Sequence, residues 1–219
     1  MNPDGEKYFP YRKTNGGKTY KIATVMSVYL VRHGQTDWNK AYVIQGRVDI
    51  PLNEEGIRQA KELAAKMKEE NIHIDLIFVS PLIRARQTAD ILNEVLHAPI
   101  LVDERIIEEY YGTFEGVSRK NEDYLKQHDN FVKRYPNGES YLDVCYRVYS
   151  FLNDIKKNYR DKNVLMVCHG GMSRLVRSFF EDEMENQDFL DNLVSNCDLK
   201  KYEFKDRHIP LSQPARELK

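Results

Sequence analysis

Several features are scarce in this sequence of 219 residues, and each scarcity excludes a class of protein. The three cysteines, Cys145, Cys168 and Cys197, are widely spaced and form no Cys-x-x-Cys pair. Their number and spacing argue against a disulfide framework and a zinc cluster, and predict buried thiols in a reducing cytoplasm. No window approaches the roughly 20 consecutive apolar residues of a membrane span. Residues 1–26 lack the apolar segment of a secretory signal. We therefore expect a cytoplasmic protein that does not contact membranes.

An excess of charge of one sign is also absent. Lys and Arg number 33, Asp and Glu number 34, and the formal net charge is −1. This balance excludes a generally basic nucleic-acid binder, so we expect no nucleic-acid partner. Hydrophobic residues make up 41% of the chain, which argues against a disordered protein. The chain is long enough, and apolar enough, to bury a substantial core.

The first 25 residues differ from the remainder of the chain. The dipeptide Asn15-Gly16 suits a type I′ turn and predicts a small hairpin there. Met26 stands directly before the first strong strand pattern. We interpret residues 1–25 as an N-terminal extension, which is native, a remnant of cloning or the product of an upstream start codon. Residues 26–219 show no internal linker or repeat and are interpreted as one domain.

Strand and helix patterns alternate through that domain. Apolar runs rich in β-branched residues predict strands at 27–31, 76–79, 100–102 and 163–168, and alternation predicts a further strand at 197–204. Helices are predicted to begin at Glu54, shortly after Pro81, at Ser140 and near Met172. The inner faces expected for the first and third of these helices are Ile57, Ala60, Leu63, Ala64 and Met67, and Leu142, Cys145, Val148, Leu152 and Ile155. Strands separated by helices predict an α/β fold, namely a three-layer α/β/α sandwich around a mainly parallel sheet.

Residues with catalytic potential follow three of the predicted strands. Arg32 and His33 follow the first, Arg84 lies shortly after the second, and His169 follows the fourth. Taken singly, such a His is usually a hydrogen-bonded structural residue and such an Arg a surface charge. Together they lie where parallel sheets bind ligands, at the carboxyl ends of the strands. A neutral His is a nucleophile that neighbouring positive charge keeps deprotonated, and guanidinium groups bind phosphate oxygens in pairs. The combination predicts phosphoryl transfer.

The same residues resemble the signature of the histidine phosphatase superfamily, in its phosphoglycerate mutase-like branch. Residues 32–39 (RHGQTDWN) carry the resemblance. It extends, in order, to residues 45–46 (QG), 52–56 (LNEEG), 80–85 (SPLIRA), 108–116 (EEYYGTFEG), 138–140 (GES) and 169–171 (HGG). The acid phosphatase and phytase branch has Arg and Pro shortly after its His-Gly, where this chain has residues 35–38 (QTDW), so that branch is disfavoured. The resemblance implies the phosphoglycerate mutase-like form of the three-layer fold.

The resemblance also implies a role for each site residue. His33 becomes phosphorylated, Glu108 is the proton donor, and the phosphate pocket is formed by Arg32, Arg84 and His169. Glu108 is preferred to Glu109 because the family's acid lies four residues before the Gly that Gly112 matches, and Glu109 is expected to face solvent or to lie behind the site. Further substrate-binding positions are Thr36, Asn39, Gln45, Gly46, Tyr111 and Gly170. Neither a metal ion nor a cofactor is expected.

The function implied is a metal-independent phosphomonoester hydrolase. It would act through phosphohistidine on small phosphorylated metabolites, either sugar phosphates or phosphorylated carboxylates. The oligomeric state is left open.

Two alternatives compete with this function. One is a cofactor-dependent phosphoglycerate mutase, but the family's mutases carry a longer insertion, with an Arg pair, where this chain has only residues 117–137. This short segment, the lid, predicts an open site with water as the acceptor, although Arg119 falls by count where mutases have a substrate-binding Lys. The second is a non-catalytic binding protein on the same fold. It is disfavoured because all five catalytic positions are occupied by the expected residues.

Overall fold

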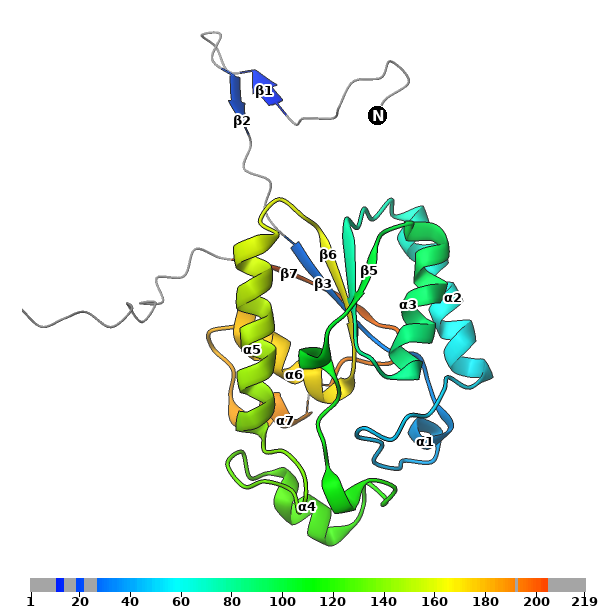
Figure 1. Cartoon of the computed structure of the whole chain (residues 1–219), viewed down its shortest axis with the longest axis vertical. Coiled ribbons are helices and arrows are strands. Elements are labelled where there is room, and N and C mark those ends of the chain that lie inside the picture. Colours follow the sequence, from blue (N-terminus) through cyan, green and yellow to red (C-terminus); the bar gives the residue numbers. More distant parts are fainter. Residues whose placement is uncertain (1–10, 14–18, 22–26, 192, 205–219) are drawn as a thin grey trace, which may run out of the picture.

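A five-stranded sheet forms the centre of the computed structural model (Figure 1). The structure describes residues 11–13, 19–21, 27–191 and 193–204. In spatial order the strands are β5 (Ile100–Val102), β4 (Leu76–Val79), β6 (Val164–Cys168), β3 (Ser27–Arg32) and β7 (Leu199–Glu203). The first four are parallel, and β7 pairs antiparallel with β3 at one edge. The predicted strands and the mainly parallel sheet are confirmed.

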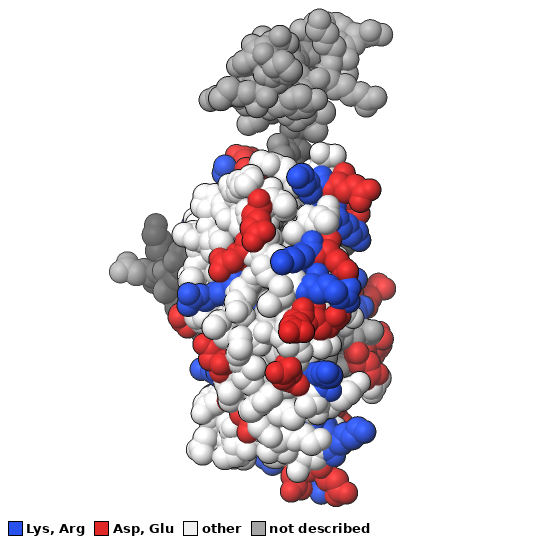
Figure 2. Space-filling model, turned by 90° about the vertical axis from the view of Figure 1, so that its right-hand side faces the viewer, with Lys and Arg blue, Asp and Glu red and all other residues white. Residues whose placement is uncertain are grey.

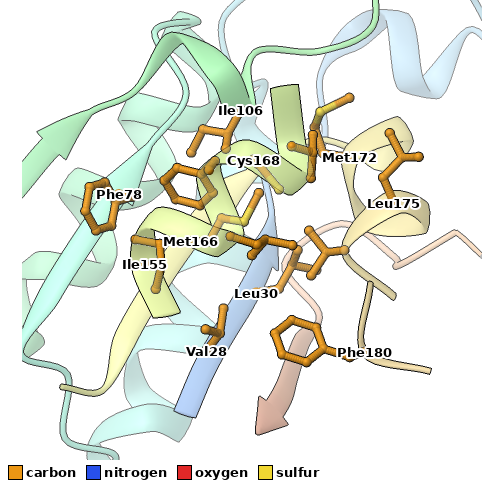
Figure 3. Packing of buried hydrophobic residues seen from close by; sticks show 14 of the residues in the cluster. Val28, Leu30, Phe78, Ile106, Ile155, Met166, Cys168, Met172, Leu175 and Phe180 are labelled. Carbon is orange, nitrogen blue, oxygen red and sulfur yellow. The ribbon is translucent and has the colours of Figure 1, made fainter. Parts of the chain in front are cut away.

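Helices cover both faces of this sheet. α2 (Glu54–Glu69) and α3 (Ile83–Leu96) pack on one face, and α5 (Tyr141–Asn158) and α6 (Gly170–Phe180) pack on the other. The side chains of β6 alternate between these two layers. Leu165 and Val167 join the cluster with α2 and α3, whereas Val164 and Met166 join the cluster with α5 and α6. Figure 3 shows Met166 within this second cluster. The three-layer α/β/α sandwich predicted from the sequence is therefore confirmed.

Shorter elements lie near the carboxyl ends of the strands (Figure 1). They are α1 (Asp37–Lys40), α4 (Glu122–His128) and α7 (Asn186–Asp191). α4 lies within the lid, and α1 directly follows the loop that leaves β3. These elements surround the edge of the sheet at which the predicted catalytic residues emerge.

Two short strands precede the sandwich. β1 (Tyr11–Lys13) and β2 (Thr19–Lys21) form an antiparallel pair separate from the main sheet. The predicted Asn15-Gly16 turn lies outside the described residues. The interpretation of residues 1–25 as an extension stays a prediction.

The inner face of α2 differs from the predicted one at its start. Ile57 is 36% exposed, so its inward placement is wrong, and Gly56 takes the buried position instead. The cause is a close approach between α2 and the loop after β3. A Cβ atom at Gly56 would lie 2.1 Å from the carbonyl oxygen of Gln35. Only glycine therefore allows the first turn of α2 to pack against this loop.

The buried face of α5, on the other side of the sheet, also differs from the predicted one. Leu142 is 56% exposed and not inward, because the buried stripe of α5 begins at Tyr141 and continues through Val144, one helical turn later. Ser140 caps α5 with a capping box, as predicted. α6 begins at Gly170, two residues before the predicted start at Met172.

Charges of both signs are interspersed on the side of the molecule shown in Figure 2. In α2, for example, Arg58 forms ion pairs with Glu55 and Glu62. Exposed pairs of this kind add little stability, usually less than about 1 kcal/mol each. Within the described residues, no helix is both long and apolar enough to cross a membrane.

Candidate active site

The register of the parallel strands brings the predicted catalytic residues to one edge. Arg32 at the end of β3 lies opposite Cys168 at the end of β6, and the His33 amide donates a hydrogen bond to the Cys168 carbonyl over 3.0 Å. His33 and His169 therefore leave adjacent strands at the same level. Their ring centroids are 5.2 Å apart. The sheet itself assembles this pair from residues that are far apart in the sequence.

A cavity of about 210 Å³ opens beside these strand ends. Nine of the eleven predicted site residues line it, namely Arg32, His33, Asn39, Gln45, Gly46, Arg84, Glu108, Tyr111 and Gly170. The two that do not are Thr36 and His169. The structure thus gathers residues from three strand ends, the loop after β3 and the segment after β5 around one space.

Two buried guanidinium groups border this cavity. Arg32 donates from Nη1 to the Val194 carbonyl (2.9 Å), and Arg84 donates from Nη2 to the Gly46 carbonyl (2.6 Å). Both Nε atoms are buried and have no partner among the described residues. Burial lowers the pKa of Arg32 to about 10, so this group stays protonated at neutral pH. Buried N–H groups without partners are costly, and the two guanidinium groups, which line the cavity, favour an anion there.

His33 is arranged as a neutral nucleophile. Its Nδ1 lies 2.7 Å from the Gly34 carbonyl oxygen, which can only accept a hydrogen bond. Nδ1 of the neutral ring therefore carries the proton, and Nε2 keeps its lone pair. Burial, followed by the charges of Arg84 and Arg32, holds the pKa of His33 well below its ordinary value of 6.5. The ring is consequently unprotonated at neutral pH and available to attack phosphorus.

His169 lies behind His33 and is fully buried. Its Nε2 is 2.6 Å from the Ser80 hydroxyl oxygen, and its Nδ1 has no partner among the described residues. Burial and the nearby Arg84 charge lower the pKa of His169 well below its ordinary value. When Nε2 accepts the Ser80 proton, Nδ1 carries the ring proton. Nδ1 then has a proton to donate, and the ring lies beside that of His33.

Thr36 acts on the site through a helix cap. Its hydroxyl accepts a hydrogen bond from the Asn39 amide (3.2 Å), and Asn39 Oδ1 accepts one from the Thr36 amide (3.1 Å). This capping box occupies the Thr36 hydroxyl and fixes Asn39 Oδ1. Asn39 lines the cavity, and its side-chain NH₂ group (Nδ2) is left to donate to a ligand.

The carboxylate of Glu108 is held at the cavity by backbone groups. Oε1 accepts from the Glu109 amide at 3.0 Å, and Oε2 accepts from the Gly171 amide at 3.4 Å. A Cβ atom at Gly171 would lie only 2.6 Å from Oε1 of Glu108. A larger residue at Gly171 would therefore displace the end of the Glu108 side chain from its place beside α6.

Of the two places expected for Glu109, the solvent-facing one is wrong, and the side chain is buried behind the cavity, which it does not line. Its residue exposure is 1%, and its side chain hydrogen-bonds with Tyr111. Burial and the neighbouring Glu108 raise the pKa of Glu109 to about 8, so this carboxyl is mainly protonated at neutral pH. The physical reason is the lid. Tyr111 packs against Tyr124 and Tyr135 of the lid, and this contact is invisible in the local sequence around residue 109.

The buried Glu109 should make the stability of the protein depend on pH. A carboxyl whose folded pKa is raised to about 8 from its ordinary 4.5 stabilises the fold fully below pH 4.5 and loses that contribution as pH rises to 8. At roughly 1.4 kcal/mol per pH unit, the loss is on the order of a few kcal/mol. Glu109→Gln, which resembles the protonated form, should therefore melt well above the parent at pH 9 and close to it at pH 5. Thermal unfolding between pH 5 and 9 measures this, with exposed Glu94→Gln as the control, and parallel curves for all three proteins would contradict it.

Several cavity residues were not singled out by the sequence. Tyr124, Leu125 and His128 come from α4, and Arg174 comes from α6. The signal for Arg174 was present, because it lies one turn after Gly170 on the same helix face. Tyr124 and His128 are likewise four residues apart on one face of α4. Arg119, noted only by its count along the lid, also lines the cavity. The short lid therefore covers part of the site.

Comparisons with known proteins identify the family of this chain. The family model of the histidine phosphatase superfamily (branch 1) matches residues 28–214. The chain is 35% identical over 188 residues to a Bacillus subtilis protein named "uncharacterized phosphatase PhoE", covering 84% of this chain and 94% of that protein. It is 36% identical over 153 residues to the Escherichia fergusonii protein named "probable phosphoglycerate mutase GpmB", covering 67% and 70%.

A solved structure gives the same fold. The mycobacterial glucosyl-3-phosphoglycerate phosphatase superposes with a TM-score of 0.71 at 24% sequence identity, over 80% of this chain and 90% of that chain. At this identity the likeness shows the fold alone. The family model and the sequence relatives carry the assignment further and confirm the resemblance found in the motifs. This chain belongs to the histidine phosphatase superfamily, branch 1.

Proposed function

We propose that this protein hydrolyses phosphomonoesters of small metabolites through a phosphohistidine intermediate, without a metal ion. One observation carries the proposal above the others. Neutral His33 lines a cavity between two buried arginines, Arg32 and Arg84, whose Nε donors have no partner among the described residues. A phosphoryl group in that cavity would satisfy these donors and lie beside the nucleophile.

The first step transfers the phosphoryl group to His33. Nε2 attacks phosphorus in line, so that an N–P bond forms while the bond from phosphorus to the ester oxygen breaks. Arg32 and Arg84 bind the equatorial oxygens and stabilise their charge, as fixed cations do in other phosphoryl transfers. This step requires Glu108 to hold a proton when the ester binds, and Glu108 gives that proton to the departing alkoxide, which must otherwise leave as a strong base.

The second step returns His33 to its free form. Glu108, now a carboxylate, takes a proton from water, and the water oxygen attacks phosphorus as the N–P bond breaks. Inorganic phosphate leaves, and Glu108 is again protonated for the next ester. The amide groups of Asn39 and Gln45 line the same cavity and supply further hydrogen bonds to the phosphoryl oxygens.

The lid supports water as the acceptor in preference to a second hydroxyl. Of its positive side chains, Arg119 lines the cavity, whereas Lys126 pairs with Asp123 and Arg134 pairs with Asp143. A mutase must hold a bisphosphate while it reorients over phosphohistidine, and this calls for cations fixed at two separated places. Because Lys126 and Arg134 pair with acids outside the cavity, Arg119 is the cation that the lid itself brings to the cavity, and the lid does not supply the enclosing set of cations that a mutase needs.

The cellular setting follows from weaker observations. A cytoplasmic location is supported by three free cysteines, Cys145, Cys168 and Cys197. A small phosphorylated metabolite as the partner is supported by the size of the cavity, and the near-neutral net charge argues against nucleic acid.

The purified protein should release inorganic phosphate from phosphomonoesters in the presence of EDTA. The reason is that Arg32, Arg84 and His33 supply the charge and the nucleophile. A panel of small monoesters measures the release. In parallel, 3-phosphoglycerate is supplied with a bisphosphate primer, and formation of 2-phosphoglycerate should be slower than release of phosphate. Fast isomerisation with negligible phosphate release would establish the mutase instead, and inactivity on every ester would point to a non-catalytic protein.

A further inference from the structure

One wall of the cavity carries a cation that the proposed chemistry does not use. Arg174 of α6 lines the cavity and is only 5% exposed. Its Nη1 donates to the Tyr141 hydroxyl (3.0 Å) and to Nε2 of His128 (3.1 Å), and Nη2 donates to the Leu190 carbonyl. Its Nε is buried and has no partner among the described residues. These bonds fix the guanidinium while leaving part of its donor capacity unused.

The charge of Arg174 is not neutralised by a nearby carboxylate. Among the described residues, none of the ion pairs within 4.0 Å includes Arg174. The acid that interacts with it through space is Glu109, whose pKa is raised to about 8 and whose charge is therefore mostly absent at neutral pH. A buried cation without a counter-charge is unfavourable, and an anion in the cavity would relieve this cost.

The neighbouring His128 cannot supply that counter-charge and does not repel the arginine. Its Nδ1 lies 3.2 Å from the Asp129 carboxylate, so Nδ1 carries the ring proton and Nε2 accepts from Arg174. Burial and the charge of Arg174 lower the pKa of His128, which keeps the ring neutral. His128 therefore orients Arg174 from the lid, as Tyr141 does from α5.

We propose that Arg174 forms a second anion site in the cavity, which selects phosphomonoesters whose alcohol part carries a carboxylate or a second phosphate. The inference rests on the proposed function, because the reacting phosphoryl group must lie beside Arg32, Arg84 and His33, and Arg174 is then left for a second negative group. The cavity, at about 210 Å³, is smaller than the roughly 300–1,000 Å³ of typical pockets for drug-sized ligands. The preferred ester is therefore a short one that carries a second negative group.

A purely structural role for Arg174 makes a different prediction. Its hydrogen bonds connect α6 to α4, to α5 and to Leu190, so its loss also loosens the fold. Loosening would lower activity on all esters in proportion. A second anion site instead changes the ratio of activities between an ester that carries the extra charge and one that lacks it. The ratio is therefore the quantity to measure.

The unaltered protein provides the first measurement. 3-Phosphoglycerate and glycerol 3-phosphate share a three-carbon skeleton. The first carries a carboxylate where the second carries a neutral hydroxymethyl group. We expect kcat/KM to favour 3-phosphoglycerate by about 30-fold, the usual value of a charge-assisted hydrogen bond to a buried group. Propane-1,3-diol bisphosphate against propane-1,3-diol monophosphate forms a second pair of short esters, and it shows whether a second phosphate serves as well as a carboxylate.

Variants of α6 then assign the preference to Arg174. Arg174→Met should lower the ratio for the preferred pair at least about tenfold, and Arg174→Lys, which keeps the charge, should retain a larger part of it. Arg177→Met is the matched control, because Arg177 lies on the same helix but forms an ion pair with Glu181 and does not line the cavity. Its ratio should equal that of the parent. An unchanged ratio in Arg174→Met would overturn the inference.

Binding separates the failure of this site from the failure of the proposed function. Calorimetry on His33→Ala, which cannot turn over, should show tighter binding of 3-phosphoglycerate than of glycerol 3-phosphate by a similar factor. Rapid hydrolysis of both esters with equal kcat/KM would remove the second anion site and leave the phosphatase in place. Hydrolysis of neither ester, with the binding preference intact, would remove the phosphatase and leave the anion site. Equal binding of both ligands would overturn the anion site.

Discussion

Replacing His33 by alanine is expected to abolish the covalent phosphoenzyme and to lower turnover by at least about 10⁴-fold, as the loss of a covalent nucleophile usually does. The structure leaves the Nε2 lone pair of His33 free, because Nδ1 faces the Gly34 carbonyl. It also keeps the ring unprotonated by burial beside Arg84 and Arg32. Rapid quenching with labelled substrate should trap a phosphoenzyme that is labile in acid and stable in base.

Two controls make this result specific to His33. His73→Ala alters a histidine whose side chain is 76% exposed, and it should leave both phosphoenzyme and turnover unchanged. His169→Ala removes a free donor beside His33 but not the nucleophile, so a phosphoenzyme should still form, more slowly. Recovery of phosphoserine, or normal turnover by His33→Ala, would refute the assignment.

The elements of the sandwich were predictable because their signals are local. Each strand of the parallel sheet is a short apolar run, and Asn53 and Ser140 cap their helices through their own side chains. The register that pairs Arg32 with Cys168 could not be predicted from the sequence. Parallel pairing of the two strands alone was enough to place His33 and His169 at one edge of the sheet.

The errors occur where distant segments decide the environment. Ile57 has the spacing of an inner residue, yet the contact between Gly56 and the loop at Gln35 fixes where α2 lies. Glu109 has the sequence context of a solvated acid, yet the packing of lid tyrosines around Tyr111 buries it. Such contacts join segments that the chain separates widely, and no local pattern of polar and apolar residues contains them.

In the site, too, residues with a local sequence signal were predicted and residues placed by distant segments were missed. Motif spacing identified nine residues that line the cavity, whereas His128 was missed because its place depends on how the lid folds back over the strand ends. Thr36 carried a readable signal of another kind. A Thr three residues before Asn39 at a helix start indicates a cap, and the hydroxyl is used there in the structure.

Glu108→Gln is expected to lower turnover of alkyl phosphates by about 10²- to 10⁴-fold, the usual contribution of a general acid. The effect should depend on the leaving group. An alkoxide is a strong base and needs a proton, whereas p-nitrophenolate leaves without one, so transfer of the phosphoryl group from p-nitrophenyl phosphate to His33 should slow by less than about tenfold. Hydrolysis of phosphohistidine is the same step for both esters, so the rate of phosphoenzyme formation in the pre-steady state is the quantity to compare.

The neighbouring carboxyl provides the matched control for this prediction. Glu109 is also buried, lies one residue away, and is already largely protonated at neutral pH because its pKa is about 8. Glu109→Gln therefore reproduces its neutral form and should leave turnover of both esters within about threefold of the parent at pH 7. The backbone amides of Glu109 and Gly171 direct the Glu108 carboxylate to the cavity, and they are unchanged in this variant. A larger loss from Glu109→Gln than from Glu108→Gln, or equal losses on the two esters in Glu108→Gln, would mean that Glu108 is not the proton donor.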